Sequence, residues 1–270
     1  MLECVVNISE GREDATLAAL AEAAGDHLLD LHRDPDHHRS VLTLVGTAAV
    51  REVARVAVDR IDLRTHDGAH PRIGVVDVVP FVALDGSTAA DALAARDAYA
   101  RWSASELGVG CYLYGPERTL PEVRRAAADG RSPDVPAPTP RPGAGHTAAG
   151  QRDVLVAYNV WLADPDVELA RSIARDIRAA GLRTLGLVVG DRVQVSMNLV
   201  DPDRIGPADA YDRVAARAEA AGAAVAGAEL VGLLPRRALD AIPRHRWSSL
   251  DLSEERTIEA RLEAIRRSPA

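Results

Sequence analysis

The chain has 270 residues, of which 47% are hydrophobic, 27% charged and 3% aromatic, and its formal net charge is −8. This composition is typical of a globular protein with one large domain or two of ordinary size. The acidic balance and the few aromatic rings argue against nucleic acid or an anionic membrane as the main partner. No apolar run reaches the roughly 20 residues of a membrane span, and the N-terminus does not resemble a signal peptide, so we expect a cytoplasmic protein.

Lysine is absent, so all 32 residues counted as lysine or arginine are arginines. This excludes enzymes that need a lysine amine, such as Schiff-base enzymes, pyridoxal-phosphate enzymes and nucleotide-binding P-loops. The two cysteines, Cys4 and Cys111, lie in apolar runs, which predicts reduced and buried side chains.

The first 115 residues alternate between strand and helix patterns. Apolar residues at helical spacing predict one helix from Leu17 and a second one from Val50 to Ile61. Four strands are predicted at LECVVNI, HLLDLH, SVLTLVG and IGVVDVVPFV. The order β-α-β-β-α-β is that of a ferredoxin-like unit. A helix at about 88–107 and a strand at GVGCYLYG extend it.

Residues 131–145 carry five prolines within ten positions, which predicts an extended connector. The β-α-β-β-α-β order then repeats, and a charged helix is predicted from about Ser253. We therefore predict an α+β protein of two similar ferredoxin-like (βαββαβ) subdomains. The N-terminal subdomain would span 1–130, a proline-rich linker 131–150 and the C-terminal subdomain 151–270, with a ligand groove between the two halves.

Histidines concentrate in one part of the first half. Six of the eight lie between His27 and His70, interleaved with aspartates, and His70 stands on a Gly-Ala-His-Pro turn ahead of an apolar strand. One interpretation is a divalent metal site, although Gly68 and Pro71 break the helix that would bring His66 and His70 onto one face. The other is that one imidazole acts as a general base, because imidazole titrates near neutrality.

Seven segments in order across about 230 residues resemble the glutamate formimidoyltransferase family. They are NISEGR, LLDLHRDPDHHRSVLTLVG, IDLRTHDGAHPRIGVVDVVPF, CYLYG, VLVAYNVWL, QVSMNL and AELVGLLP. The resemblance implies two similar α/β subdomains lining an electropositive groove. It also implies transfer of a formimidoyl group from N-formimidoyl-L-glutamate to tetrahydrofolate in histidine degradation and one-carbon metabolism. The cyclodeaminase domain of some members is expected to be absent, and the family implies a homodimer.

Carried over by position, His70 falls on the catalytic histidine of the family. The resemblance implies that it accepts the proton as the folate N5 attacks the formimidoyl carbon. His32 aligns with a position that is acidic in some members and would orient His70. Tetrahydrofolate would be the acceptor substrate, with no metal and no nucleotide.

Both substrates are anionic, and arginines beside the proposed site suit their carboxylates. The positions assigned to substrate or folate binding are Asn7, Ser9, Gly11, Arg39, Arg64, Arg72, Gly143, Gly145, Thr147, Arg152 and Asn198.

The connector departs from the family pattern, which tends to carry a Gly-Ala-Thr-x-x-Gly-Ala-Arg run where this chain has Gly145–Arg152 as GHTAAGQR. One alternative is therefore a folate-binding or small-anion-binding homologue without turnover. A second is a metal-dependent hydrolase that uses the His32–His70 cluster. A third is a transferase that moves a formyl group to the same acceptor.

Overall fold

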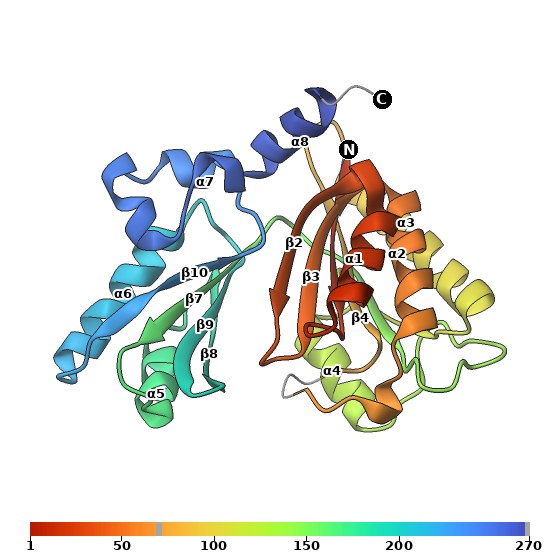
Figure 1. Cartoon of the computed structure of the whole chain (residues 1–270), viewed down its shortest axis with the longest axis horizontal. Helices are drawn as coiled ribbons and strands as arrows, with labels where there is room; N and C mark the ends of the chain where they lie inside the picture. Colours follow the sequence, from red (N-terminus) through yellow and green to blue (C-terminus); the bar gives the residue numbers. More distant parts are fainter. Residues whose placement is uncertain (69–71, 268–270) are drawn as a thin grey trace. The chain divides into compact units, whose positions relative to one another are not determined.

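The computed structural model describes residues 1–68 and 72–267, which form two compact units, Met1–Asp153 and Val154–Ala270. The elements of each unit can be followed in Figure 1. In the described residues, no helix combines the length and the apolar character that a membrane span requires.

The first unit contains a six-stranded sheet in the order β2-β3-β1-β4-β6-β5. Its strands are β1 (Leu2–Ile8), β2 (Leu28–Asp34), β3 (Arg39–Val45), β4 (Val76–Ala83), β5 (Cys111–Tyr114) and β6 (Thr147–Gln151). Its helices are α1 (Asp14–Ala24), α2 (Thr47–Arg60), α3 (Ala89–Trp102) and α4 (Leu120–Ala128), and a π-helical turn at Ser103–Leu107 follows α3. The first four strands run antiparallel in the predicted ferredoxin-like order, and β6 is parallel to both β4 and β5.

Alternation along the strands places the main core of this unit on the helix side of the sheet. Cys4, Val6 and Ile8 of β1 face α1, α2 and α3, and the three helices cover one face of the sheet in Figure 1. A smaller core lies on the other face, where Val123 of α4 packs with Val78 and Tyr112. Both cysteines are buried and carry free thiols, as the sequence predicted.

The second unit contains the four-stranded sheet β10-β7-β9-β8. Its strands are β7 (Val156–Leu162), β8 (Leu182–Val189), β9 (Arg192–Leu199) and β10 (Val225–Val231), and its helices are α5 (Val167–Ile177), α6 (Pro207–Ala220), α7 (Arg236–Asp240) and α8 (Ile258–Arg267). The order β7-α5-β8-β9-α6-β10 repeats the topology of β1 to β4. The predicted fold class, an α+β protein of two βαββαβ subdomains, is confirmed.

Two elements of the first unit were not predicted from the sequence. Helix α4 begins at a capping box, in which Thr119 and Glu122 exchange backbone and side-chain hydrogen bonds. Strand β6 begins within the range 131–150 that the sequence assigned to a linker, and the residues before it also pair with the first unit. Gly145 bridges Gly74, and His146 N–H donates to the carbonyl of Ile73 at 2.8 Å.

Candidate functional site

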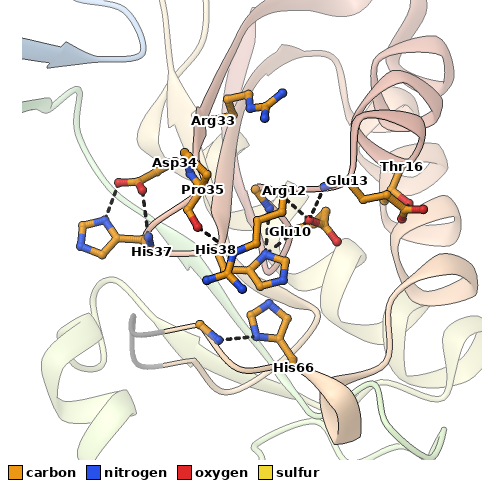
Figure 2. Close-up of polar contacts among 12 residues, drawn as sticks. Glu10, Arg12, Glu13, Thr16, Arg33, Asp34, Pro35, His37, His38 and His66 are labelled. Atoms are coloured by element: carbon orange, nitrogen blue, oxygen red, sulfur yellow. Dashed lines mark hydrogen bonds and ion pairs between the residues drawn. The ribbon is translucent and has the colours of Figure 1, made fainter. Parts of the chain in front are cut away.

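Three segments of the first unit meet at one end of its sheet. The β1 loop (residues 9–13) follows β1, the hairpin turn (34–38) joins β2 to β3, and the β4 approach (62–68 and 72–75) precedes β4. Because these strands are antiparallel neighbours, the end of β1 and the beginnings of β3 and β4 lie at the same end of the sheet. Figure 2 shows several of their side chains, among them Glu10, Arg12, Asp34, His37, His38 and His66.

The hairpin turn is organised by Asp34. Its carboxylate accepts hydrogen bonds from the backbone N–H of Asp36 at 2.9 Å and of His37 at 2.8 Å, and its second oxygen lies 2.6 Å from His37 Nδ1. Burial acts to raise the pKa of Asp34, but the hydrogen bonds from His37 and Asp36 outweigh it, and the net shift is downward. The turn is closed by His38, whose φ of 51° lies in the left-handed region that histidine tolerates better than most residues.

The β1 loop ties the other two segments together through Arg12. Its Nε donates to the carbonyl of Pro35 in the hairpin turn at 2.8 Å, and Nη1 lies 2.7 Å from the Asp67 carboxylate in the β4 approach. The Glu10 carboxylate accepts the backbone N–H groups of Arg12 at 2.7 Å and Glu13 at 2.9 Å, just ahead of α1. The negative charge of Glu10 therefore lies where the helix dipole favours it.

A pair of stacked histidines stands between the segments. The rings of His38 and His66 lie face to face with centroids 4.0 Å apart and an interplanar angle of 26° (Figure 2). His38 Nδ1 is 3.2 Å from the Gly11 amide, and His66 Nδ1 accepts the Gly68 amide at 3.1 Å. Arg72 Nη1 also contacts the His66 ring, at Nδ1 and, at 3.0 Å, at Nε2. Burial lowers the pKa of His38, although the Glu10 carboxylate opposes this.

A buried carboxylate, Asp77, lies at the start of β4. The register between β1 and β4 pairs Asn7 with Val78 but Ile8 with Val76, so Asp77 is the extra residue of a β-bulge. Its carboxylate accepts the backbone N–H of Ile73 at 2.8 Å and pairs with Arg124 of α4 at 2.6 Å.

Three guanidinium groups lie within electrostatic reach of Asp77: Arg39, Arg72 and Arg124, which we call the arginine cluster. Burial lowers the pKa of Arg39 to about 10. The Asp77 carboxylate acts to raise this pKa, whereas the positive charges of Arg124 and Arg72 lower it further. Burial likewise lowers the pKa of Arg72, again against Asp77. The mutual repulsion of these cations favours an anion at this end of the sheet.

The predicted site residues fall into several places. His70 lies outside the described residues, so its predicted role stays a prediction. His32 lies on β2 opposite Val41 and is half-buried. Arg39 and Arg72 belong to the arginine cluster, whereas Arg64 is exposed and forms a two-nitrogen ion pair with Asp62.

Asn7, Ser9 and Gly11 occupy the end of β1 and the loop after it. The Ser9 hydroxyl donates to the carbonyl of Gly74 at 2.8 Å, and the Asn7 amide donates to the carbonyl of Val5 at 2.9 Å. Gly11 packs so closely that a Cβ atom there would lie 2.2 Å from the carbonyl oxygen of Asp34. The contacts of Ser9 and Gly11 hold the β1 loop against the β4 approach and the hairpin turn.

The predicted connector residues Gly143, Gly145, Thr147 and Arg152 all lie in the first unit. The carbonyl of Gly143 accepts the N–H of Leu63 at 2.9 Å, and the Thr147 hydroxyl donates to the carbonyl of Val76 at 2.7 Å.

Gly145 lies against the β4 approach, and the backbone N–H of Arg152 donates to the carbonyl of Phe81 in β4 at 3.2 Å. Asn198 is exposed on β9 of the second unit. The groove predicted between the two halves stays a prediction.

Four residues of this site were not predicted from the sequence: Glu10, Arg12, Asp77 and Arg124. Asp77 could have been found from the sequence, because a carboxylate inside an otherwise apolar strand is rarely buried without a partner. Nothing in the sequence pattern indicates its partner, Arg124, which lies 47 positions further along the chain.

The interleaved acids and histidines have partners of their own. Asp34 holds His37 and the turn backbone, and Asp67 pairs with Arg12. In residues 1–68 and 72–267, no group of three or more His, Cys, Asp or Glu side chains is arranged to hold a metal ion.

Comparison with known proteins identifies the family. Residues 1–156 match the family model described as formiminotransferase domain, N-terminal subdomain, and residues 157–265 match the formiminotransferase domain. The chain is 33% identical to a glutamate formimidoyltransferase of Streptococcus pyogenes serotype M1, over 88% of this chain and 90% of that protein. It is 30% identical to a glutamate formimidoyltransferase of Thermoplasma acidophilum, over 97% of each.

A formimidoyltransferase-cyclodeaminase of Sus scrofa is 32% identical over 88% of this chain, and the match spans 51% of that longer protein. Both family models and the full-length relatives cover nearly all of the chain. The chain therefore belongs to the formiminotransferase family.

Proposed function

We propose that this chain transfers the formimidoyl group of N-formimidoyl-L-glutamate to tetrahydrofolate, with His70 as the general base. The observation that carries the proposal is the match to the formiminotransferase family along almost the whole chain, together with relatives named glutamate formimidoyltransferase. The arrangement of the first unit supports it, because histidines and arginines of the β1 loop, the hairpin turn and the β4 approach lie together at one end of the sheet.

The arginine cluster suits the charge of the substrates. N-formimidoyl-L-glutamate carries two carboxylates, and the folate tail carries further ones. A guanidinium group binds a carboxylate through two parallel hydrogen bonds, and these are strongest in a partly buried site. Arg39 and Arg72 are both half-buried and lie at the end of the sheet where β4 begins. We assign them to the carboxylates of the substrates.

The reaction needs one proton acceptor that later serves as a donor. The folate N5 forms a bond to the formimidoyl carbon and must lose its proton to complete the amidine. The bond between that carbon and the glutamate nitrogen then breaks, and the departing nitrogen takes a proton. An imidazole near its ordinary pKa performs both transfers without a net change in its own protonation. His70 is the histidine that the family resemblance assigns to this role.

The direct test is an assay of the purified chain with N-formimidoyl-L-glutamate and tetrahydrofolate. The assay measures the formation of 5-formimidoyltetrahydrofolate and glutamate. We expect His70→Ala to lower kcat by at least about 10²-fold while folate affinity stays within a few-fold, as for a residue that acts in the chemical step. His245→Ala is the matched control, because His245 is exposed in the second unit. Undiminished turnover in His70→Ala would overturn the role of His70.

Two related measurements distinguish the alternative functions. Folate binding by calorimetry without any transfer product would favour a binding homologue, and turnover with N-formylglutamate in place of the formimidoyl donor would favour a formyltransferase. We further expect a cytoplasmic homodimer, which fractionation and light scattering test. The histidine-degradation role is tested by growth on histidine as the nitrogen source after disruption of the gene.

A further inference from the structure

Strand β8 is the last strand of the sheet in the second unit, and it carries exposed apolar side chains. It pairs with β9 along its whole length and has no strand on its other side in the described sheet. In residues 1–68 and 72–267, the large hydrophobic side chains that are exposed are Met1, Leu185 at 59% and Val188 at 53%. Two of these three lie on this one edge strand. An edge strand with exposed apolar residues is a surface to which a further strand can add.

The first half of the outer edge of β8 is closed by the residues that precede the strand. The N–H of Leu182 donates to the carbonyl of Ala179 at 3.0 Å, and its own carbonyl accepts the N–H of Ala179 at 3.3 Å. The carbonyl of Thr184 accepts a hydrogen bond from Arg178 Nη2 at 2.9 Å. The outer edge is therefore occupied as far as Thr184.

The second half of the outer edge is open to a partner. Backbone groups along an antiparallel strand point alternately to one side and to the other. Because Leu182 and Thr184 direct theirs outward, the N–H and C=O of Gly186 and Val188 also point outward, whereas the odd-numbered residues direct theirs to β9. A strand added to β8 would form its hydrogen bonds at Gly186 and Val188.

These open groups fit a second copy of the same strand in one register. In an antiparallel pair about a two-fold axis beside Leu187, Gly186 of each copy lies opposite Val188 of the other, and each such pair exchanges both backbone hydrogen bonds. A register centred on Gly186 would instead place Val188 opposite Thr184, whose carbonyl already accepts from Arg178. The register centred on Leu187 uses the open groups and no others.

The charges at the two ends of β8 agree with the same register. Arg183 lies near the start of the strand and Asp191 lies in the turn that follows it, and both are exposed. With the axis beside Leu187, Arg183 of each copy faces Asp191 of the other. Opposite charges across neighbouring strands stabilise the pairing, so the two ends of the interface are complementary.

The exposed apolar side chains would be covered in this arrangement. Thr184 and Gly186 face α5, since the Thr184 hydroxyl donates to the carbonyl of Ala174 and a Cβ atom on Gly186 would lie 2.4 Å from the nitrogen of Arg171. The odd-numbered side chains therefore point to the other face of the sheet. There Leu187 would meet its own counterpart on the axis, and Leu185 of each copy would meet Val189 of the other.

We propose that β8 pairs with β8 of a second copy of this chain about a two-fold axis beside Leu187, which joins the two sheets into one continuous sheet. The proposal locates the surface of the homodimer expected above. It does not depend on the transfer reaction, because all of its contacts lie on β8 and in the turn that follows.

A cysteine on the axis tests the register. Leu187→Cys would place two thiols opposite each other in a pair without mutual hydrogen bonds, with Cα atoms about 4.5 Å apart, which a disulfide can span. Leu185→Cys is the matched control, because its two copies would lie about 14 Å apart. The native thiols, Cys4 and Cys111, are buried and leave the background silent. We expect mild oxidation to convert most Leu187→Cys chains into covalent dimers on a non-reducing gel, and almost none of the control; equal cross-linking of the two variants, or none in either, would overturn the register.

A proline at the open edge tests the backbone hydrogen bonds. Val188→Pro removes an outward N–H and leaves the bonds to β9 in place, as proline does on edge strands, whereas Val188→Ala keeps that N–H. In sedimentation velocity of the full chain at about 20 μM, we expect the wild type and Val188→Ala to be dimers and Val188→Pro to be a monomer, with the dissociation constant raised about 100-fold or more. A monomeric wild type, or a Val188→Pro dimer as tight as the wild type, would overturn the proposal.

Reversal of the charges keeps the test decisive if Val188→Pro does not fold, because Arg183 and Asp191 are both exposed. Arg183→Asp places like charges opposite each other at both ends of the interface, and we expect it to raise the dissociation constant about tenfold or more. Addition of Asp191→Arg restores opposite charges and should return the constant to within about threefold of the wild type. No weakening in Arg183→Asp, or no recovery in the double variant, would count against this surface. These measurements need no turnover, so a chain without transferase activity would end the proposed function and leave this result standing.

Discussion

Replacement of Asp77 by asparagine tests the centre of the arginine cluster. The substitution keeps an amide oxygen for the N–H of Ile73 but removes the charge that pairs with Arg124 at 2.6 Å. Loss of one partner from a fully buried ion pair costs about 3–5 kcal/mol. The Asp77 side chain is 2% exposed, but that of Arg124 is 25% exposed and keeps some contact with water. We therefore expect the free energy of unfolding of the first unit to fall by about 2–3 kcal/mol.

Tryptophan fluorescence can follow the two units separately. Trp102 belongs to the first unit, whereas Trp161 and Trp247 belong to the second. In a variant that carries phenylalanine at positions 161 and 247, the tryptophan fluorescence therefore reports unfolding of the first unit alone. With a urea m-value of about 2 kcal/mol/M, the midpoint of unfolding should fall by about 1–1.5 M.

A double-mutant cycle decides whether the loss comes from the ion pair. Arg124→Gln and the double variant complete the cycle with Asp77→Asn, and we expect a coupling energy of at least about 1.5 kcal/mol. Two results would refute the reasoning. One is an Asp77→Asn midpoint within about 0.25 M of the wild type, and the other is a coupling energy near zero.

Three further predictions concern particular contacts. Gly11→Ala should lower the free energy of unfolding by about 2–3 kcal/mol, because the added methyl group would lie 2.2 Å from the carbonyl oxygen of Asp34; a wild-type urea midpoint would contradict this. The folded pKa of Asp34 is lowered by its bonds to His37 despite burial, so its stabilising contribution is present above about pH 4 and is lost as the pH falls through the folded value. Asp34→Asn should therefore flatten the fall of Tm below about pH 4, and an unchanged acid limb would argue against it. Burial raises the pKa of both thiols, that of Cys111 to about 12. Ellman's reagent should therefore modify Cys4 and Cys111 only after unfolding, and rapid reaction of the native chain would contradict this.

Much of the fold could be predicted from the sequence, because the core positions repeat at regular spacing. The alternation of the core residues Cys4, Val6 and Ile8 along β1 and the apolar stripe of α2 each follow from residues that are close along the chain. Strand β6 could not be found this way. Its sequence, TAAGQ, has small side chains and little β-branching, and it is a strand because β4 and β5 pair with it on both sides.

The sequence predicted that histidines concentrate in one part of the first half, but not how they are connected. The hairpin turn and the β4 approach, which carry His37, His38 and His66, meet at one end of the sheet. The contacts of Arg12 with Pro35 and Asp67 span 23 and 55 positions, and no periodic pattern encodes such pairs. His38 and His66 were recognised as part of a histidine-rich region, but their stacking follows only from the fold.

The β-bulge at Asp77 is not required for β1 and β4 to pair. If that residue were deleted, Val76 and Val78 would become consecutive opposite Ile8 and Asn7, and the ladder between β1 and β4 would close as an unbroken one. The pairing would thus be more regular with one residue fewer. The extra residue instead supplies the buried carboxylate that accepts the N–H of Ile73 and pairs with Arg124.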